Sequence, residues 1–300
     1  MTVTTVPDPT APSSTDLGVR TIQRSRRFRN GLATVLICTT VVITVVPLLL
    51  IFGYVLKRGL EVISLDFFTK PVPIVSRLPG PGMGPAVVGT ILITGAAALM
   101  AIPLGVMAAI YLSEYGRGRP LTAVLRFLSD VMSGVPSIVM GLFIYTVWVL
   151  TFGQSGFAGA LALAALMLPI VIRSSESMLR LVPQDLREAA YALGTRRSRT
   201  ILTVVLPAAL PGVVSGCLLA VARAAGETAP LLFCVGAARE FNTDLLHGAN
   251  TALSVQIFRN AQLPFVGPQQ RAWGAALTLI VLVLVLTILA RWVSSRFAVR

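Results

Sequence analysis

The feature that most constrains this chain is a series of six long apolar segments separated by shorter polar ones. These segments lie at about residues 32–56, 85–112, 134–152, 158–172, 204–231 and 272–289. A helix needs about 20 apolar residues to cross a bilayer, and it satisfies its own backbone hydrogen bonds inside the lipid. The chain is 55% hydrophobic and only 12% charged, which is more apolar surface than a soluble domain can bury. We therefore predict an all-α polytopic membrane protein with six transmembrane helices in contact with membrane lipid.

The basic residues predict which side of the membrane each end of the chain faces. Most of the 25 Lys and Arg residues lie in the N-terminal tail, in residues 117–126 and 173–199, and at the C-terminus. Cytoplasmic segments carry an excess of Lys and Arg, so both ends are expected inside the cell (N-in, C-in). The first apolar segment starts too far into the chain, and is too long, to be a cleaved signal peptide. Because the arginines flank apolar segments, the net charge of +13 indicates membrane topology and not a nucleic-acid partner.

Neither a metal site nor an ATP site is predicted within the chain. The three cysteines, Cys38, Cys217 and Cys234, lie inside or beside apolar segments without a Cys-x-x-Cys spacing, which is typical of small apolar residues. The single histidine, His247, excludes a multi-histidine metal site. No Gly-x-x-x-x-Gly-Lys-[Ser/Thr] phosphate-binding loop occurs, and neither lysine follows a glycine. The chain is therefore not expected to be an ATP-hydrolysing enzyme.

The polar stretch between the fourth and fifth apolar segments has the pattern of a short helix with a defined end. Pro183 suits the first turn, where a backbone N–H has no helical partner anyway. Gly194 can adopt the left-handed conformation that closes a helix C-terminus. One narrow apolar stripe is predicted on this helix, made of Leu186, Ala189 or Ala190, and Leu193. The small alanines leave room for another protein to approach closely, and the arginines that follow indicate a cytoplasmic location.

This stretch resembles the EAA loop of binding-protein-dependent ABC importer permeases. That loop reads Glu-Ala-Ala, three residues, Gly, nine residues, Ile, one residue, Leu-Pro, and here it begins at Glu188 and ends at Pro207, with Val204 in place of the Ile. The resemblance implies that a separate ATPase subunit docks on the loop. It assigns this coupling to Glu188, Ala189, Ala190, Gly194, Leu206 and Pro207. It also implies a second permease, because six spans supply only half of the usual importer pathway.

Three further segments, residues 133–143, 173–183 and 223–231, resemble phosphate importer permeases. Residues 273–291 fit the same family more loosely, so the likeness covers roughly residues 84–295. The run Arg223-Ala-Ala-Gly-Glu-Thr-Ala-Pro-Leu231 discriminates best, and its Ala-Pro-Leu ending favours the PstA type over its PstC partner. The N-terminal tail and residues 57–83 depart from the family pattern, and no role is assigned to them.

The resemblance also implies a domain organisation and a set of partners. A type I ABC importer permease core of the MetI-like fold is expected in residues 84–295, with the coupling loop at 183–207. Before it come a basic, disordered tail (1–30) and a first transmembrane helix with its outer segment (31–83). The implied complex is a phosphate importer in the plasma (inner) membrane of a prokaryote. Its other members are a PstC-type permease, a PstB-type ATPase dimer that binds ATP and Mg²⁺, and an extracytoplasmic PstS-type phosphate-binding protein. No cofactor is expected in this chain itself.

Arg223 and Glu227 are the predicted substrate-contacting residues, because charges in the outer half of a membrane span are costly and are usually kept for function. They are expected to share one face of the fifth span, four residues apart, and to pair with each other. A planar guanidinium can donate two hydrogen bonds to a tetrahedral oxyanion. The glutamate would moderate its affinity, and Thr228 adds a hydroxyl. Arg173 is a weaker candidate at a cytoplasmic helix end. An equally good interpretation is a salt bridge that fixes helix packing or the contact with the second permease.

The sequence leaves other functions open. Molybdate, tungstate and sulfate importers share the architecture, and their substrates are also tetrahedral oxyanions. Gly153-Gln-Ser-Gly156 imitates a serine nucleophile motif, so an intramembrane serine protease with Ser155 as nucleophile and His247 as base is a more distant alternative. Against it, Ser155 is expected in a surface turn and His247 in an outer segment. A self-contained secondary transporter or channel would leave the EAA loop unexplained.

Overall fold

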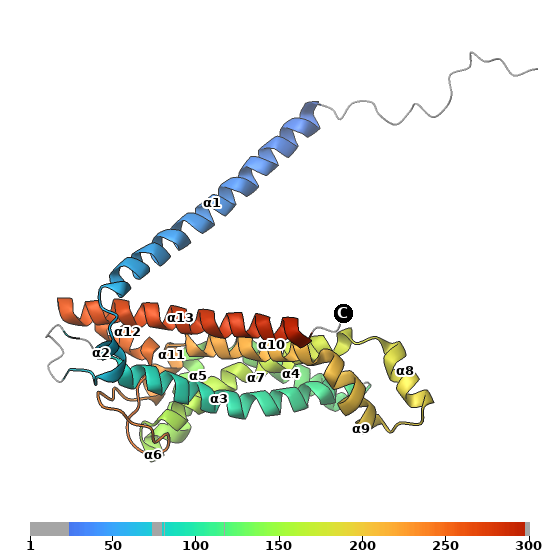
Figure 1. Cartoon of the computed structure of the whole chain (residues 1–300). Coiled ribbons are helices and arrows are strands. Elements are labelled where there is room, and N and C mark those ends of the chain that lie inside the picture. Colours follow the sequence, from blue (N-terminus) through green and yellow to red (C-terminus); the bar gives the residue numbers. More distant parts are fainter. Residues whose placement is uncertain (1–23, 74–79, 81, 117, 298–300) are drawn as a thin grey trace, which may run out of the picture. The chain divides into compact units, whose positions relative to one another are not determined.

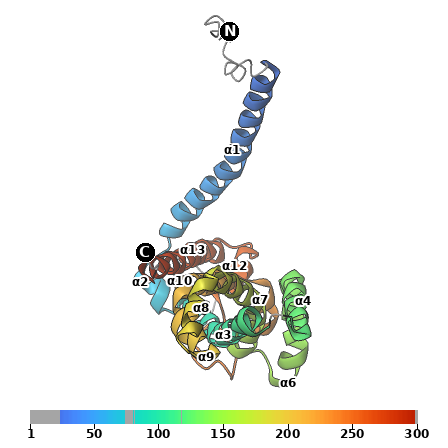
Figure 2. The same ribbon diagram turned by 90° about the vertical axis from the view of Figure 1, so that its right-hand side faces the viewer.

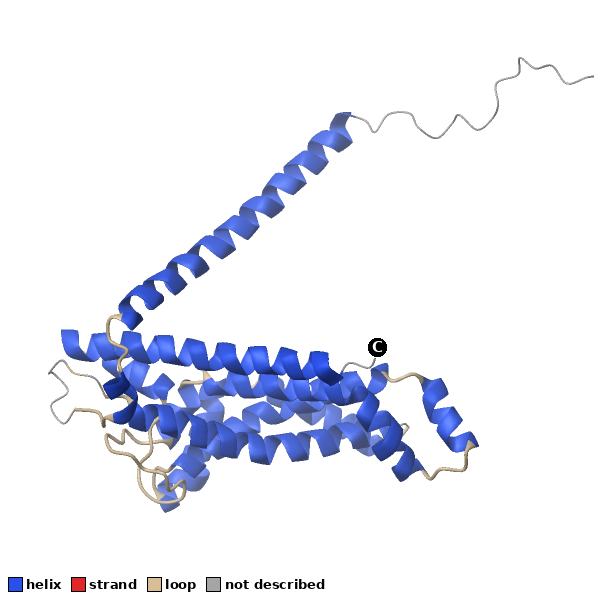
Figure 3. Ribbon diagram, in the orientation of Figure 1, coloured by secondary structure: helices blue, strands red, loops and turns tan. Residues whose placement is uncertain are grey.

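The computed structural model describes residues 24–73, 80, 82–116 and 118–297, and every regular element in these ranges is a helix (Figures 1 and 3). This confirms the predicted all-α fold. The predicted tail of residues 1–30 falls mostly outside the described residues. The chain forms two compact units, residues 1–54 and 55–300.

Most of α1 (Arg24–Leu60) belongs to the first unit. Every side chain from Arg29 to Tyr54 is exposed, including a long series of Leu, Val and Ile. The hydroxyls of Thr34, Thr40 and Thr44 each donate, at 2.9 Å, to the backbone carbonyl four residues earlier, which satisfies them in an apolar environment. A helix that is apolar on all sides and not covered by protein is suited to lipid, as predicted for this segment.

Four long helices form the centre of the second unit: α3 (Gly84–Ile110), α7 (Gly156–Leu181), α10 (Leu206–Ala225) and α13 (Val266–Phe297). α7 packs against α3 and α10, and α10 packs against α13 (Figures 1 and 2). Ala97 of α3, Leu163 of α7 and Ala220 of α10 are fully buried in their common core. At Gly105 of α3, an added Cβ would lie only 2.7 Å from Cγ1 of Val171. Small residues let helices approach closely in lipid, and these helices use them in that way.

The predicted third span, residues 134–152, begins at a sharp break in the chain. α4 (Pro120–Gly134) meets the following helical stretch at an angle of 102°. That stretch consists of α5 (Ser137–Ile144), the π-helical turn η2 (Tyr145–Val149) and α6 (Leu150–Phe152). The break falls at Val135 and Pro136, because a proline lacks the helical N–H and disfavours the helical conformation of the residue before it. Among the described residues, five helices are long and apolar enough to cross a membrane, or six if this bent pair counts as one span.

α4 turns its polar side toward its own chain. Thr122 and Ser129 are buried, whereas Leu121, Val124 and Leu128 are each about half exposed. A globular protein arranges an amphipathic helix the other way round. The apolar side of α4 therefore needs lipid or another protein as its partner.

Three predicted boundaries, which belong to the fourth and fifth spans, are wrong. The sequence predicts a continuous fifth span to residue 231, but α10 ends at Ala225, and α11 (Ala229–Cys234) follows after a turn. This span also begins earlier than predicted, because α9 (Arg197–Thr200) and the π-helical turn η3 (Ile201–Val205) run into α10. The fourth span is predicted to end at residue 172, but α7 continues to Leu181. In that extension Glu176 and Arg180 pair one helical turn apart, which supports the helix beyond its apolar part.

Several of the shorter helices lie at the two ends of the second unit. Figure 1 shows α8 (Gln184–Ala192) and α9 at one end, with α2 (Leu65–Thr69) and α12 (Leu253–Ala261) toward the other. The backbone N–H of Leu253 donates to Thr90 Oγ1 of α3 at 2.8 Å, so a side chain of the bundle holds the start of α12. The long helices thus connect two differently built ends.

Candidate functional site

The stretch that resembles the EAA loop forms α8 and a tight turn before α9. Pro183 lies one residue before α8, as its N-cap, and not inside the first turn as predicted. Gly194 has a φ of +77°, and its N–H donates to the carbonyl of Tyr191 at 2.9 Å. The N–H of Thr195 donates to the carbonyl of Ala190 at 3.2 Å. The left-handed glycine therefore ends the helix and turns the chain, as predicted.

α8 and the turn after it present an exposed surface that contains three of the six predicted coupling residues, Glu188, Ala189 and Gly194. The exposed residues are Leu186, Glu188, Ala189, Leu193 and Gly194. Ala190 is buried, so the predicted stripe contains Ala189 and not Ala190. Leu193 is 84% exposed, the highest value for any large apolar residue among those described. An exposed apolar strip beside a carboxylate is typical of a docking surface.

The last two predicted coupling residues lie elsewhere. Leu206 and Pro207 begin α10, so α9 and η3 separate them from α8. They are part of the fifth span and not of the exposed surface of the loop. The EAA pattern therefore covers two structural parts, the exposed helix and the start of a membrane helix.

Two charged residues that the sequence did not single out hold α8 in place. Arg187 and Glu114 form an ion pair at 2.8 Å, and each side chain is only 6% exposed. Glu114 lies in η1 (Tyr111–Tyr115), the π-helical turn that ends the second span. The available signals were weak: an acid directly after an apolar segment, and an arginine directly before Glu-Ala-Ala.

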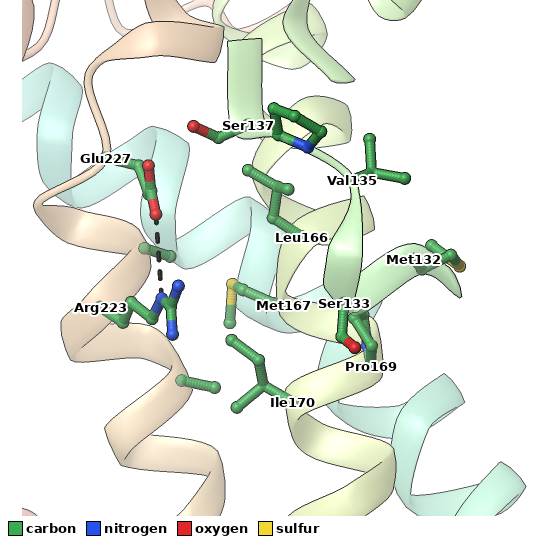
Figure 4. Close-up of a pocket in the computed structure, with 13 residues that line it drawn as sticks. Met132, Ser133, Val135, Ser137, Leu166, Met167, Pro169, Ile170, Arg223 and Glu227 are labelled. Carbon is green, nitrogen blue, oxygen red and sulfur yellow. Dashed lines mark ion pairs between the residues drawn. The ribbon is translucent and has the colours of Figure 1, made fainter. Parts of the chain in front are cut away.

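Arg223 and Glu227 pair, as predicted, although they do not share a helical face. Arg223 lies in the last turn of α10, and Glu227 follows the end of that helix, beyond Gly226. Arg223 Nε and Glu227 Oε1 are 3.9 Å apart, and the two side chains are 70% and 25% exposed (Figure 4). The contact is therefore a loose ion pair that leaves much of the guanidinium accessible.

Both side chains line a cavity of about 310 Å³. Its other walls come from α7 and from the break between α4 and α5 (Figure 4). The end of α4 contributes Ser133, the start of α5 contributes Ser137, and α7 contributes apolar residues such as Met167. Thr228 is not among the described residues that line this cavity, because it lies at the start of α11. The cavity therefore combines the Arg223–Glu227 ion pair, two serine side chains and apolar walls.

Arg173 lies in a second cavity, of about 470 Å³, between α4 and α7. It is inside α7 and not at a helix end as predicted, and its guanidinium pairs with Asp130 of α4. In the same cavity Glu176 accepts hydrogen bonds from Arg126 at 2.8 Å and Arg180 at 2.6 Å. Three arginines and two acids line this cavity, so its net charge is positive.

Ser155 and His247, the residues of the protease alternative, are engaged in other contacts. Ser155 is buried and not in a surface turn, and its Oγ accepts from the N–H of Ala158 at 3.2 Å as the N-cap of α7. Nδ1 of His247 lies 2.9 Å from Oδ2 of Asp244. Hydrogen bonds from the backbone N–H of Leu246 and from the His247 ring lower the pKa of the Asp244 carboxyl. Ser155 thus acts as a helix cap, and the protease alternative is not favoured.

The acidic side chains that line the two cavities are paired with arginines and not arranged around a metal ion. Across the part of the chain that the structure describes, no three His, Cys, Asp or Glu side chains are placed to hold a metal ion. Cys217 and Cys234 are buried and free, and Cys38 is exposed and free. The acids of the two cavities instead contact Arg126, Arg173, Arg180 and Arg223.

Known relatives cover almost the whole chain. Residues 101–299 match the family described as binding-protein-dependent transport system inner membrane component. The phosphate transport system permease protein PstA 1 of Mycobacterium tuberculosis is 43% identical over 284 residues, which cover 92% of each chain. The corresponding PstA of Mycobacterium leprae is 44% identical over 269 residues, or 88% of each chain. That of Yersinia pestis is 43% identical over 275 residues, covering 91% of this chain and 92% of the relative.

Solved ABC transporters share the fold. An inward-facing form of the MetNI methionine ABC transporter superposes with a TM-score of 0.58 at 19% identity, covering 71% of this chain and 94% of that one. A second inward-facing form of the same transporter gives a TM-score of 0.55 at 20% identity, with coverage of 71% and 93%. These likenesses establish a MetI-like permease fold, and the relatives establish the subgroup. The chain therefore belongs to the binding-protein-dependent transport system inner membrane components, and among them to the PstA permeases.

Proposed function

We propose that this multi-pass protein of the plasma membrane is a permease subunit of an ATP-driven importer of inorganic phosphate. Its relatives at 43–44% identity are named phosphate transport system permeases. The observation that carries the proposal is the cavity with Arg223 and Glu227, where an accessible guanidinium lies within a bundle of membrane helices. Charges at membrane depth are costly and usually mark a substrate pathway.

The geometry of the pair supports transient binding of phosphate. The 3.9 Å separation leaves N–H groups of Arg223 able to donate to a phosphate, which a guanidinium can hold through two bonds at once. Ser137 lines the same cavity, and its hydroxyl can donate to another phosphate oxygen, whereas the hydroxyl of Ser133 donates to the backbone carbonyl of Asp130 at 2.7 Å. Glu227 competes for the arginine and repels the anion, so that phosphate is released again. A pathway needs this moderate affinity.

The pathway is completed by a second permease in this proposal. Arg223 is 70% exposed in the single chain, as a residue at a shared pathway would be. The apolar side of α4 likewise lacks a partner within the chain. The second permease is of the PstC type, and a PstS-type binding protein delivers phosphate from outside. Arg173, in the second and net positive cavity, is the secondary candidate for contact with phosphate on its way to the cytoplasm.

A separate ATPase supplies the energy in this proposal. The exposed side of α8, with Glu188, Ala189 and Leu193, is the surface on which a PstB-type dimer docks. That dimer binds ATP and Mg²⁺, and this chain contributes no catalytic residue and no cofactor. Leu206 and Pro207, at the start of α10, would follow the movement of the loop without contacting the ATPase.

Uptake by cells that lack their own copy of this gene tests the proposal. Expression of this chain is expected to restore uptake of labelled phosphate, and an excess of molybdate, tungstate or sulfate is expected to leave that uptake unchanged. Purification of the chain through an affinity tag should recover an ATPase subunit and a second permease. Restored uptake of one of the other oxyanions, with none of phosphate, would overturn the substrate assignment.

Gly194→Val is expected to lower transport while the protein still inserts into the membrane. The left-handed conformation costs a residue with a Cβ roughly 1–2 kcal/mol, so valine would misdirect the turn after α8. Apart from its two chain neighbours, no described residue has an atom within 4 Å of an added Cβ, so the effect would come from the backbone alone. Gly194→Asn is the matched control, because asparagine tolerates this conformation. Equal uptake by both variants, at equal protein levels, would show that the turn is not needed for coupling.

A further inference from the structure

Arg187 belongs to the buried side of α8, away from the exposed surface, and only 6% of its side chain is exposed. Its guanidinium donates to the carbonyl of Leu179 at 2.9 Å and to that of Val182 at 2.5 Å, at the end of α7. It also donates to Glu114 Oε1 at 2.8 Å. The last carbonyls of a helix lack helical partners and carry partial negative charge, so a cation is favourable there. One side chain of α8 therefore holds the ends of two membrane helices.

The residue next to Glu114 holds the other arm of the loop. The guanidinium of Arg197, the first residue of α9, lies 4.8 Å from the ring centroid of Tyr115, as a cation–π contact. Glu114 and Tyr115 are consecutive residues of η1, so the end of the second span contacts α8 and α9 together. π-helical turns such as η1 occur frequently at functional sites. A cavity of about 260 Å³, lined by residues of η1, α8 and α9, leaves space for these groups to move.

α7 connects this cluster to the cavity that contains Arg223. Its last carbonyls bind Arg187, and its middle part forms one wall of the cavity, including Met167. α7 also packs closely on α3, where a Cβ added at Gly105 would lie 2.7 Å from Val171. Closely packed helices transmit a displacement instead of absorbing it. A movement of α8 is therefore passed on to α7 and α3 together.

We propose that Arg187 is the positioning residue that passes the movement of a docked ATPase from α8 to the substrate pathway, with Glu114 as its partner on the second span. This inference rests on the proposed function, because it requires an ATPase that docks on α8. The exposed side of α8 binds the partner, and the buried side, through Arg187, moves the helices. The physical link is a contiguous chain of contacts from the docking surface to the cavity.

Arg187→Gln and Glu114→Gln test this role in the whole complex, reconstituted in proteoliposomes with its binding protein and phosphate. We expect the ATPase subunit to co-purify in normal amount and to hydrolyse ATP. The number of phosphate ions moved per ATP hydrolysed should fall roughly tenfold or more. The reason is that each variant loses the charge-assisted hydrogen bond between Arg187 and Glu114, which connects α8 to the second span. The exchange Arg187→Glu with Glu114→Arg should restore part of that ratio. Arg196→Gln, which changes an exposed arginine of the same loop, is the matched control and should keep the wild-type ratio.

Three results would overturn the inference. One is an unchanged ratio in both variants. Another is an equal fall of hydrolysis and transport with the amount of assembled complex, which would make the pair merely structural. The third is the same loss of ratio in Arg196→Gln. If the complex with Arg187→Gln does not assemble, the result for Glu114→Gln decides the question. That variant should assemble, because the glutamine amide keeps an oxygen that accepts a hydrogen bond from Arg187. Failure of the proposed function would be visible separately, since the wild-type complex would then move no phosphate.

Discussion

Arg223→Gln is expected to lower phosphate uptake roughly 10- to 100-fold, which corresponds to the ~1.5–3 kcal/mol of a hydrogen bond to a charged group. Glutamine keeps an amide donor but loses the charge and the planar fork that bind an oxyanion. The Arg223 side chain is 70% exposed, so its removal leaves no deeply buried partner, and the complex should still assemble. Uptake of labelled phosphate per assembled complex measures the effect. Thr228→Val is the matched control, because Thr228 does not line the cavity, and it should change uptake little.

Charge exchange separates a substrate contact from a structural salt bridge. If the pair only fixes helix packing, Arg223→Glu combined with Glu227→Arg should restore uptake, because an ion pair remains possible. If Arg223 binds phosphate, the exchange should stay inactive, because the cation then starts from the turn beyond α10 and not from the helix. Arg223→Lys adds a second test. Loss of uptake with lysine, in an assembled complex, indicates that the guanidinium geometry matters and not only the charge. Restored uptake in the exchanged variant would refute the substrate role.

The parts of the fold that depend on local composition could be predicted from the sequence. Six apolar segments indicated membrane helices, because the length of a bilayer-spanning helix is fixed by the thickness of the lipid. The closing turn at Gly194 was also predictable, since glycine is the residue that adopts its φ of +77° without strain. The EAA spacing located α8, although the start of the helix was one residue off at Pro183.

The parts that depend on contacts between distant segments could not be predicted. Arg187 and Glu114 are 73 residues apart, and only the packing of α8 against the end of the second span brings them together. The same holds for the cavity, in which Ser133, from the last turn of α4, lies opposite Arg223 (Figure 4). The end of α7 was predicted too early for a related reason. Glu176 supports α7 beyond the apolar segment through its pair with Arg180, whereas hydropathy alone predicts an end where the charges begin.

Gly89→Ala is expected to destabilise the protein by about 3 kcal/mol, at the upper end of the usual range for overpacking a core. Gly89 lies in α3, and a Cβ added there would be 2.0 Å from the carbonyl oxygen of Thr251. That oxygen belongs to the backbone of a buried residue just before α12, so it cannot turn away like a flexible side chain. Thr90, the next residue of α3, also holds the start of α12 through its hydroxyl. The added methyl group would therefore push α12 away from the bundle and break this hydrogen bond.

Gly95→Ala, in the same helix, is the matched control for this effect. Gly95 is exposed, and outside its own helix turn no described residue has an atom within 4 Å of an added Cβ. The substitution therefore changes only the helix propensity at this position. Alanine in place of glycine stabilises a helix interior by roughly 0.5–1 kcal/mol. Thermal unfolding of the purified protein in detergent should therefore show a lower midpoint for Gly89→Ala and an equal or higher one for Gly95→Ala. Equal midpoints would mean that α12 can shift without cost. In that case the close approach of α3 to Thr251 would not fix the end of the bundle where α12 lies.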